Sequence, residues 1–295
     1  MRSKLGKIEG IITALVTPFD ARGEVDESAL RELIDFQVKG GVNGVFVCGT
    51  AGLGPIMRPD QRVQTFRVAA KQSRGRIPIV AHVGAPSTEE TVKLAGEAEA
   101  AGVDALGCVT PYYVTPDDES MLTHYKAVLS AAKLPVYVYN IPRNATNNVS
   151  PELMKRLVEA GVAGVKDSSR DFVQVMEYLQ VLPPSATVIC GTDSYILPAL
   201  LMGAKGAITG YANAFPEVYA QLWRAYKGGH AEEARQLQFR VNSLRKLLQK
   251  PAIAPHYEAL RLRGVDAGNP RAPLRAMNAK ETQTLKEQLM KLGVL

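Results

Sequence analysis

The chain alternates eight times between a short apolar run and a stretch with helical periodicity, and this alternation restricts its possible folds more than any other feature. The apolar runs cover residues 11–18, 42–50, 77–84, 105–110, 136–140, 162–166, 187–191 and 206–210. The helical patterns lie between them at 26–39, 59–73, 88–101, 118–132, 151–160, 172–179 and 195–202. Runs that are apolar at nearly every position are typical of parallel strands buried on both faces.

Eight strand–helix units within about 210 residues predict an α/β protein, a TIM (β/α)8 barrel over residues 1–213. The alternative is an open, doubly wound sheet. It is less favoured because no glycine-rich phosphate loop follows the first apolar run. Beyond the barrel, helical patterns continue without strands at 218–226, 231–248 and 281–292. We therefore predict a C-terminal helical extension over residues 214–295.

The composition argues against nucleic acid and membrane partners. The chain is 46% hydrophobic and 22% charged, as in ordinary globular proteins, and no apolar run reaches the roughly 18 residues of a membrane span. The net charge is +6, but the densest basic group, at 240–263, has acidic residues among or near it. We interpret this group as a solvated helical face rather than a nucleic-acid site.

The cysteines and the first residues of the chain indicate in which cellular compartment the protein is expected. Cys48, Cys108 and Cys190 lie in separate apolar runs, without the spacing of a disulfide framework or a zinc site. Residues 1–7 are basic but are not followed by the apolar core of a secretory signal. We therefore expect a cytoplasmic protein with reduced thiols.

Lys166 is the residue with the clearest chemical implication. It directly follows the apolar residues 162–165 and precedes a predicted turn at 167–169. In a TIM barrel the active site lies at the carboxyl ends of the strands. Burial there would lower the lysine pKa and leave free amine to attack a carbonyl near neutral pH. The alternative is a lysine whose end reaches out to water.

Other polar residues follow the strands and complete a candidate site. Tyr139 ends the run before Lys166 and is placed to move protons, unless it only packs at the barrel rim, and Thr50 is a candidate for a relay. The turn at 49–52 offers backbone N–H groups to a carboxylate. Together these groups suit Schiff-base chemistry on a 2-oxo acid. No metal-ligand spacing or phosphate site is evident, so no metal or cofactor is expected.

Five short motifs in matching order resemble the class I, pyruvate-dependent aldolases, the family of dihydrodipicolinate synthase, N-acetylneuraminate lyase and 2-keto-3-deoxygluconate aldolase. The motifs are Gly-Thr-Ala-Gly at 49–52, Thr-Pro-Tyr-Tyr at 110–113, Tyr-Asn-Ile-Pro at 139–142, Gly-Val-Lys-Asp at 164–167 and Gly-Thr-Asp at 191–193. The resemblance implies a barrel in which Lys166 forms the Schiff base, Tyr139 transfers protons and Thr50 belongs to the relay.

The resemblance also implies substrate contacts and an assembly. Ile208 would line the pocket beside the lysine, and Asp193 would hold substrate hydroxyl groups. Tyr113 would lie near the site of a neighbouring subunit in a homotetramer built as a dimer of dimers. The expected partners are a 2-oxo acid and an aldehyde.

Two departures from the family pattern bear on the substrate. Ala51 replaces a second hydroxyl residue, and the Gly-Leu-Gly-Pro run at 52–55 resembles archaeal-type 2-keto-3-deoxygluconate aldolases. Asn144 stands where dihydrodipicolinate synthases carry an arginine for the aldehyde's carboxylate, and Arg143 comes one residue early. Asparagine offers a donor and an acceptor without charge, which suits hydroxyl groups.

We therefore predict a lyase that reversibly cleaves a 2-oxo-3-deoxy sugar acid, or a similar hydroxylated 2-oxo acid, to pyruvate and an aldehyde. A dihydrodipicolinate synthase that uses Arg143 is the nearest alternative. Hydratase or dehydratase chemistry on the same imine also stays open. A barrel that binds without turnover would fit Ala51 and Asn144, but the intact Lys166 and Tyr139 argue against it.

Overall fold

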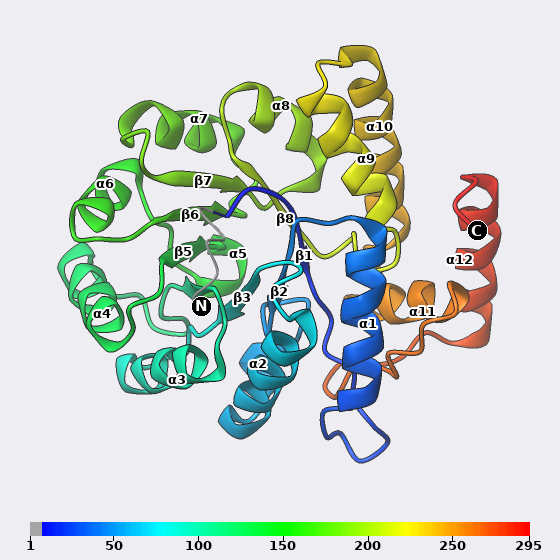
Figure 1. Cartoon of the computed structure of the whole chain (residues 1–295), viewed down its shortest axis with the longest axis horizontal. Coiled ribbons are helices and arrows are strands. Elements are labelled where there is room, and N and C mark those ends of the chain that lie inside the picture. Colours follow the sequence, from blue (N-terminus) through cyan, green and yellow to red (C-terminus); the bar gives the residue numbers. More distant parts are fainter. Residues whose placement is uncertain (1–7) are drawn as a thin grey trace.

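The computed structural model describes residues 8–295, in which eight parallel strands form a closed barrel (Figure 1). The strands are β1 (Gly10–Ala14), β2 (Gly44–Val47), β3 (Ile79–His82), β4 (Ala105–Val109), β5 (Val136–Asn140), β6 (Gly164–Asp167), β7 (Thr187–Cys190) and β8 (Gly206–Thr209). Neighbours pair in chain order and β8 pairs with β1. The predicted TIM barrel is confirmed, and the open sheet is excluded. The prediction for residues 1–7 lies outside the described residues.

Alternating residues of each strand enter two separate cores. One set fills the barrel interior and includes Ile12, Phe46, Val80, Tyr139, Ile189 and Ile208. The other set packs against the surrounding helices and includes Ile11, Val45, Val138, Val165 and Val188. Because Val165 faces the helices, the next residue of β6 faces the barrel interior. The strand period therefore directs the side chain of Lys166 inward.

Helices surround the barrel in chain order (Figure 1). They are α1 (Glu27–Gly40), α2 (Pro59–Ser73), α3 (Thr88–Ala101), α4 (Asp118–Ala131), α6 (Pro151–Glu159), α7 (Phe172–Val181), α8 (Ile196–Leu201) and α9 (Pro216–Lys227). Several begin where a side chain caps the first turn; the Asp26 carboxylate, for example, accepts from the Ala29 N–H. Short helical turns follow three strands: η1 (Gly54–Ile56), α5 (Pro142–Ala145) and η2 (Asp193–Tyr195). These turns were not predicted, since three or four residues carry no helical period.

Three further helices complete the C-terminal part: α10 (Ala231–Leu247), α11 (Ala254–Leu262) and α12 (Ala279–Lys291). α9 packs on α1 and β1, and α10 packs along α9 and against η2. α11 was not predicted, because it is only nine residues long and Pro255 near its start is a typical loop signal. The division into a barrel (1–213) and an extension (214–295) stays a prediction. Among the described helices, none is both long and apolar enough to cross a bilayer.

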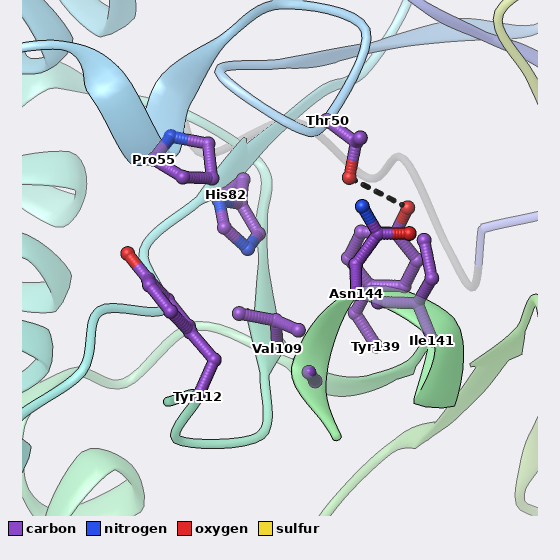
Figure 2. Close-up of a pocket in the computed structure, with 9 residues that line it drawn as sticks. Thr50, Pro55, His82, Val109, Tyr112, Tyr139, Ile141 and Asn144 are labelled. Atoms are coloured by element: carbon purple, nitrogen blue, oxygen red, sulfur yellow. Dashed lines mark hydrogen bonds between the residues drawn. The ribbon is translucent and has the colours of Figure 1, made fainter. Parts of the chain in front are cut away.

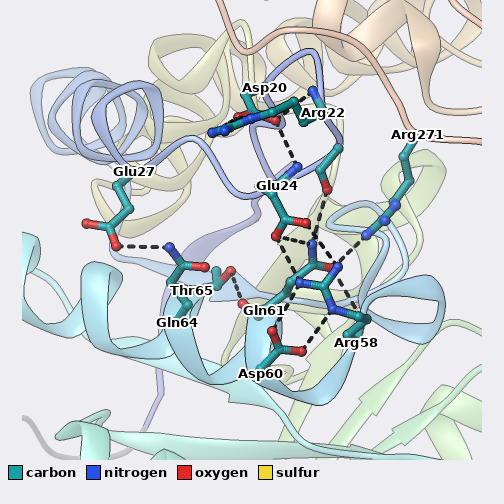
Figure 3. A network of polar contacts seen from close by, with 11 residues as sticks. Asp20, Arg22, Glu24, Glu27, Arg58, Asp60, Gln61, Gln64, Thr65 and Arg271 are labelled. Atoms are coloured by element: carbon teal, nitrogen blue, oxygen red, sulfur yellow. Dashed lines mark hydrogen bonds and ion pairs between the residues drawn. The ribbon is translucent and has the colours of Figure 1, made fainter.

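A polar network fixes the segment after α11 to the barrel (Figure 3). The Arg271 guanidinium donates to Gln61 Oε1 at 2.8 Å, and Gln61 Nε2 donates to the Gly23 carbonyl at 3.1 Å. Arg58 beside them pairs with Glu24 at 2.9 Å. The C-terminal segment is thus tied to α2 and to the loop between β1 and α1.

The three cysteines are buried free thiols, as expected. Burial raises the pKa of the Cys48 and Cys108 thiols to about 12. Because the thiolate is the reactive form, these thiols are inert at neutral pH.

Candidate active site

Lys166 is buried in the barrel, where it lies opposite Tyr139 in the register of β5 and β6. Its Nζ is 3.6 Å from the centroid of the Tyr139 ring and 4.5 Å from that of the Phe46 ring. The residue is 4% exposed, which excludes a side chain that reaches out to water. Burial lowers the Lys166 pKa from 10.5 to about 7, and the nearby Asp193 partly opposes this change. A large fraction of the amine is therefore uncharged at neutral pH.

Tyr139, which lies against this lysine, forms a hydrogen-bonded pair with Thr50. Figure 2 shows this pair. The Tyr139 hydroxyl and Thr50 Oγ1 are 3.2 Å apart, and either oxygen can donate. The Tyr139 ring meets Phe46 edge-on at 5.7 Å and His82 edge-on at 5.9 Å. Burial raises the Tyr139 pKa, which the bond to Thr50 partly offsets. Tyr139 is thus a neutral phenol with a second hydroxyl in reach, the geometry of a proton relay.

Asn140 and Asp167, which follow Tyr139 and Lys166 in the chain, hold the ends of β5 and β6 together. Asn140 Nδ2 donates to Asp167 Oδ1 at 2.8 Å, and the Ser168 N–H donates to the Asn140 carbonyl at 2.8 Å. Asp167 also accepts from the Ser169 N–H at 3.1 Å. Asn140 and Asp167 follow Tyr139 and Lys166 directly, so these bonds fix the reacting side chains relative to one another.

The turn after β2 packs closely against its own strand. The Gly54 N–H donates to the Gly49 carbonyl at 3.1 Å, and Thr17 Oγ1 donates to the Gly52 carbonyl at 2.6 Å. A Cβ on Gly54 would lie 1.7 Å from the Cys48 carbonyl oxygen, so only glycine fits there. This packing sets Ala51 in the wall of the cavity that contains Lys166.

That cavity has a volume of about 240 Å³. Seven of the eight predicted site residues line it: Lys166, Tyr139, Thr50, Ala51, Asn144, Asp193 and Ile208. Tyr113 does not line it; this side chain is 93% exposed on a backbone with a φ of 77°. The structure therefore brings the predicted residues of one chain together, and the role of each stays a prediction.

Asp193 faces the cavity from η2. Thr209 Oγ1 donates to its carboxylate, and Gln238 Nε2 on α10 donates to its carbonyl at 2.8 Å. Burial raises the Asp193 pKa to about 6, against the effect of the Thr209 bond. A carboxylate held in this way has acceptor sites left for substrate hydroxyl groups.

Several further lining residues were not predicted as site residues, among them Ser168, Arg170, Tyr211, Arg245, Ile253 and His256. Arg143, which also lines the cavity, was considered only as a substitute arginine. The interpretation of the basic group at 240–263 as a solvated face was wrong for Arg245, which is half-buried in the cavity wall. Helical spacing does not tell which face of α10 covers the barrel mouth. Arg170 follows the Lys166 motif closely, a signal that was available.

A smaller cavity of about 120 Å³ adjoins the first (Figure 2). Pro55, His82, Val109 and Tyr112 are among its lining residues, and Thr50, Tyr139 and Asn144 line both cavities. Burial keeps the His82 pKa well below its usual range, so the imidazole is neutral. The Tyr139–Thr50 pair is therefore reached from two sides.

A resident metal has no evident ligand set in the part of the chain that the structure describes. No group of three or more His, Cys, Asp and Glu side chains in residues 8–295 is arranged to hold an ion. The expectation of a site without metal stays a prediction.

The barrel is closed, and a lysine, a Tyr–Thr pair and a carboxylate gather at the carboxyl ends of its strands. This is the architecture of a TIM-barrel enzyme. The chain belongs to the dihydrodipicolinate synthetase family, whose model matches residues 7–292. The resemblance read from the five motifs is therefore confirmed at the level of the family. Membership supports a carbon–carbon lyase of the aldolase type as the enzyme class.

Similar proteins cover nearly the whole chain. An uncharacterized DapA-like lyase of Halobacterium salinarum is 37% identical over 290 residues, 98% of this chain and 95% of the relative. The crystal structure of dihydrodipicolinate synthase from Aquifex aeolicus has a TM-score of 0.91 and 32% identity, covering 97% of this chain and 99% of its own. A catalytic lysine mutant of Ruminococcus gnavus sialic acid aldolase has a TM-score of 0.94 and 26% identity, covering 99% and 97%.

Proposed function

We propose that the protein is a class I lyase that reversibly cleaves a 2-oxo-3-deoxy sugar acid, or a similar hydroxylated 2-oxo acid, to pyruvate and an aldehyde. The observation that carries the proposal is Lys166, an amine with a pKa of about 7 buried against the ring of Tyr139. An uncharged lysine is the nucleophile that forms imines with 2-oxo acids.

The residues divide the reaction between them. Lys166 Nζ attacks C2, and loss of water gives an iminium that accepts the electron pair of the breaking C3–C4 bond. Tyr139, hydrogen-bonded to Thr50, gives its proton to the hydroxyl that leaves as water, and the phenolate so formed takes the proton from the C4 hydroxyl as the aldehyde forms. The resulting enamine is protonated at C3, and hydrolysis of the iminium releases pyruvate and restores the amine.

The cavity wall suits the two halves of such a substrate. We assign the 2-oxo acid carboxylate to Thr50 and to the backbone N–H groups of the turn that carries Ala51. Asn144 and Asp193 then serve the hydroxyl groups of the departing half. Ile208, beside the lysine, keeps the inner end apolar.

Borohydride trapping with pyruvate tests the imine. We expect a reduced adduct that maps to Lys166 by peptide mass and that is absent from K166M. Lys246 is an exposed lysine outside the cavity and serves as the internal control for non-specific reaction. No adduct with pyruvate or with 2-keto-3-deoxygluconate would refute the proposal and favour a barrel that binds without turnover.

A dihydrodipicolinate synthase is the second candidate, because Arg143 lines the cavity and a synthase from Aquifex aeolicus has a closely similar fold. Arg143 would bind the carboxylate of aspartate semialdehyde next to the position where Asn144 stands. Condensation of pyruvate with aspartate semialdehyde, compared with cleavage of 2-keto-3-deoxygluconate, separates the two. Release of water from 2-keto-3-deoxygluconate without pyruvate formation would instead indicate dehydratase chemistry.

We also propose a homotetramer built as a dimer of dimers. Tyr113 is 93% exposed and lies outside the cavity of its own chain, and Val114 beside it is 58% exposed. A large exposed aromatic next to an apolar residue is typical of an interface. Light scattering on the purified protein measures the assembly, and Y113A should reduce it.

A further inference from the structure

His256 on α11 lines the lysine cavity with an imidazole that the fold leaves partly unpaired. The residue is 6% exposed, and its Nδ1 is buried and has no hydrogen-bond partner within residues 8–295. Burial lowers the His256 pKa to about 4, so at neutral pH the ring carries one N–H and one lone pair. An unpaired polar group in the core costs free energy that an apolar side chain would not. This imidazole therefore indicates a ligand.

The ring nitrogen of His256 nearest to Gly210 is Nε2. A Cβ on Gly210 would lie 3.9 Å from Nε2 and 3.3 Å from the Ala51 Cβ. The imidazole and Ala51 therefore flank one small space, which a glycine at position 210 leaves open. All three residues line the cavity that contains Lys166. A ligand atom in this space would meet Nε2 on one side and the turn after β2 on the other.

The space beside Ala51 is close to the reacting groups. Thr50 directly precedes Ala51, and its Oγ1 is 3.2 Å from the Tyr139 hydroxyl. The Tyr139 ring centroid is in turn 3.6 Å from Lys166 Nζ. In a 2-oxo acid, the carboxylate carbon is bonded to C2, the atom that the amine attacks. The group that binds this carboxylate must therefore stand near the amine, as the space between Ala51 and His256 does.

A chain of hydrogen bonds fixes α11 against the turn after β2. Tyr257 is 1% exposed, and its hydroxyl donates to the Thr17 carbonyl at 2.8 Å. Thr17 Oγ1 donates to the Gly52 carbonyl of the turn at 2.6 Å. The Tyr211 ring packs on the imidazole of His256, with centroids 5.1 Å apart. The imidazole is thus held at a fixed place relative to the turn before any ligand binds.

We propose that His256 binds the carboxylate of the 2-oxo acid, donating from Nε2–H into the space between Ala51 and Gly210. This inference rests on the proposed lyase function and adds a side chain from α11 to the groups that hold the 2-oxo acid. A hydrogen bond from an N–H to a carboxylate is charge-assisted and stronger than one between neutral groups. Ala51 has no hydroxyl group for the same oxygen, so His256 is the side-chain donor on this wall. The buried Nδ1 then carries only the lone pair.

Borohydride trapping without an aldehyde tests the 2-oxo acid half alone. The ligand concentration that gives half-maximal trapping is measured for pyruvate and for methyl pyruvate, whose ester has no charge. H256L removes the donor, and it should raise this concentration for pyruvate by about 10-fold or more and change it for methyl pyruvate by less than about 3-fold. H230L removes an exposed imidazole outside the cavity and should change neither value.

Rescue variants distinguish a hydrogen bond from mere packing. H256Q keeps an N–H donor on a side chain of similar reach and should recover most of the lost pyruvate affinity. A51S, added to H256L, brings a hydroxyl group to the other side of the same space, and it should improve pyruvate trapping more in H256L than in the wild type. If H256L does not fold, G210A fills the space and should weaken pyruvate trapping with His256 in place.

The outcomes separate this inference from the proposed function. Trapping of pyruvate by H256L at wild-type concentrations, or an equal loss for pyruvate and methyl pyruvate, would overturn the role of His256 and leave the lyase standing. A change confined to the KM of the aldehyde would also overturn it. If the wild type forms no imine, calorimetry with pyruvate still reads the contact. Binding that H256L weakens supports it, and no binding, or binding that H256L leaves unchanged, overturns it.

Discussion

Replacing Lys166 by methionine should stabilise the protein, because the fold buries an ammonium group at a large cost. A fall in pKa from 10.5 to about 7 corresponds to about 5 kcal/mol against the charged form, at about 1.4 kcal/mol per pH unit. Methionine has a similar length and adapts to an apolar barrel interior. We expect K166M to raise the free energy of unfolding below pH 7 by up to about 5 kcal/mol.

The pH dependence distinguishes this effect from ordinary repacking. Between pH 7 and 10.5 the unfolded chain keeps the Lys166 proton and the native chain has lost it, so wild-type stability rises with pH in this window. The slope that Lys166 contributes approaches about 1.4 kcal/mol per pH unit. The advantage of K166M is therefore greatest below pH 7, shrinks as the pH rises and is gone above 10.5.

Urea unfolding of both proteins at pH values from 6 to 10 measures this difference. K246M, which removes an exposed lysine of α10, serves as the control and should follow the wild type in pH dependence. Parallel stability curves for K166M and the wild type would refute the reasoning. They would mean that Lys166 keeps its proton in the native protein and that burial does not supply the free amine.

Three further predictions concern the surroundings of the lysine. Y139F should lower cleavage by about 10²- to 10⁴-fold while borohydride trapping on Lys166 persists; loss of both would assign Tyr139 to imine formation instead. D193N removes the charge that raises the Lys166 pKa, so the rising limb of imine formation against pH should move to lower pH; an upward shift would contradict this. G107A places a Cβ 2.3 Å from the Phe46 ring and should lower the melting temperature, and a crystal structure with Phe46 unmoved would count against the clash.

The barrel could be predicted because the apolar runs of its strands are visible in a single sequence. Each apolar run needs residues that suit both the inner and the outer core, and such runs differ visibly from helical patterns. Lys166 and Tyr139 could be found for the same reason, since each is a polar group at the end of an apolar run. Their neighbours in space, Asn140 and Asp167, follow them directly in the sequence.

The remainder of the cavity wall was harder to predict. Arg245 and His256 come from helices whose spacing says nothing about which residues cover the barrel mouth. α11, which carries His256, is only nine residues long and has Pro255 near its start, a typical loop signal. Arg170 lies in a turn, where no period applies, and only its place close behind Lys166 in the sequence pointed to the site. Tertiary packing brings these residues into the site, and no local pattern in the sequence indicates that packing.

The Lys166 pKa couples the amine to the wall of the cavity. Burial lowers this pKa and Asp193 raises it, and Arg245 in turn lowers the pKa of Asp193. A change at Arg245 should therefore reach the supply of free amine through Asp193. Lys166 stands on a strand, whereas Arg143, Arg170 and Arg245, which also line the cavity, stand on α5, a turn and α10. Strands fix the chemistry while the segments above them set specificity, as is general for TIM barrels.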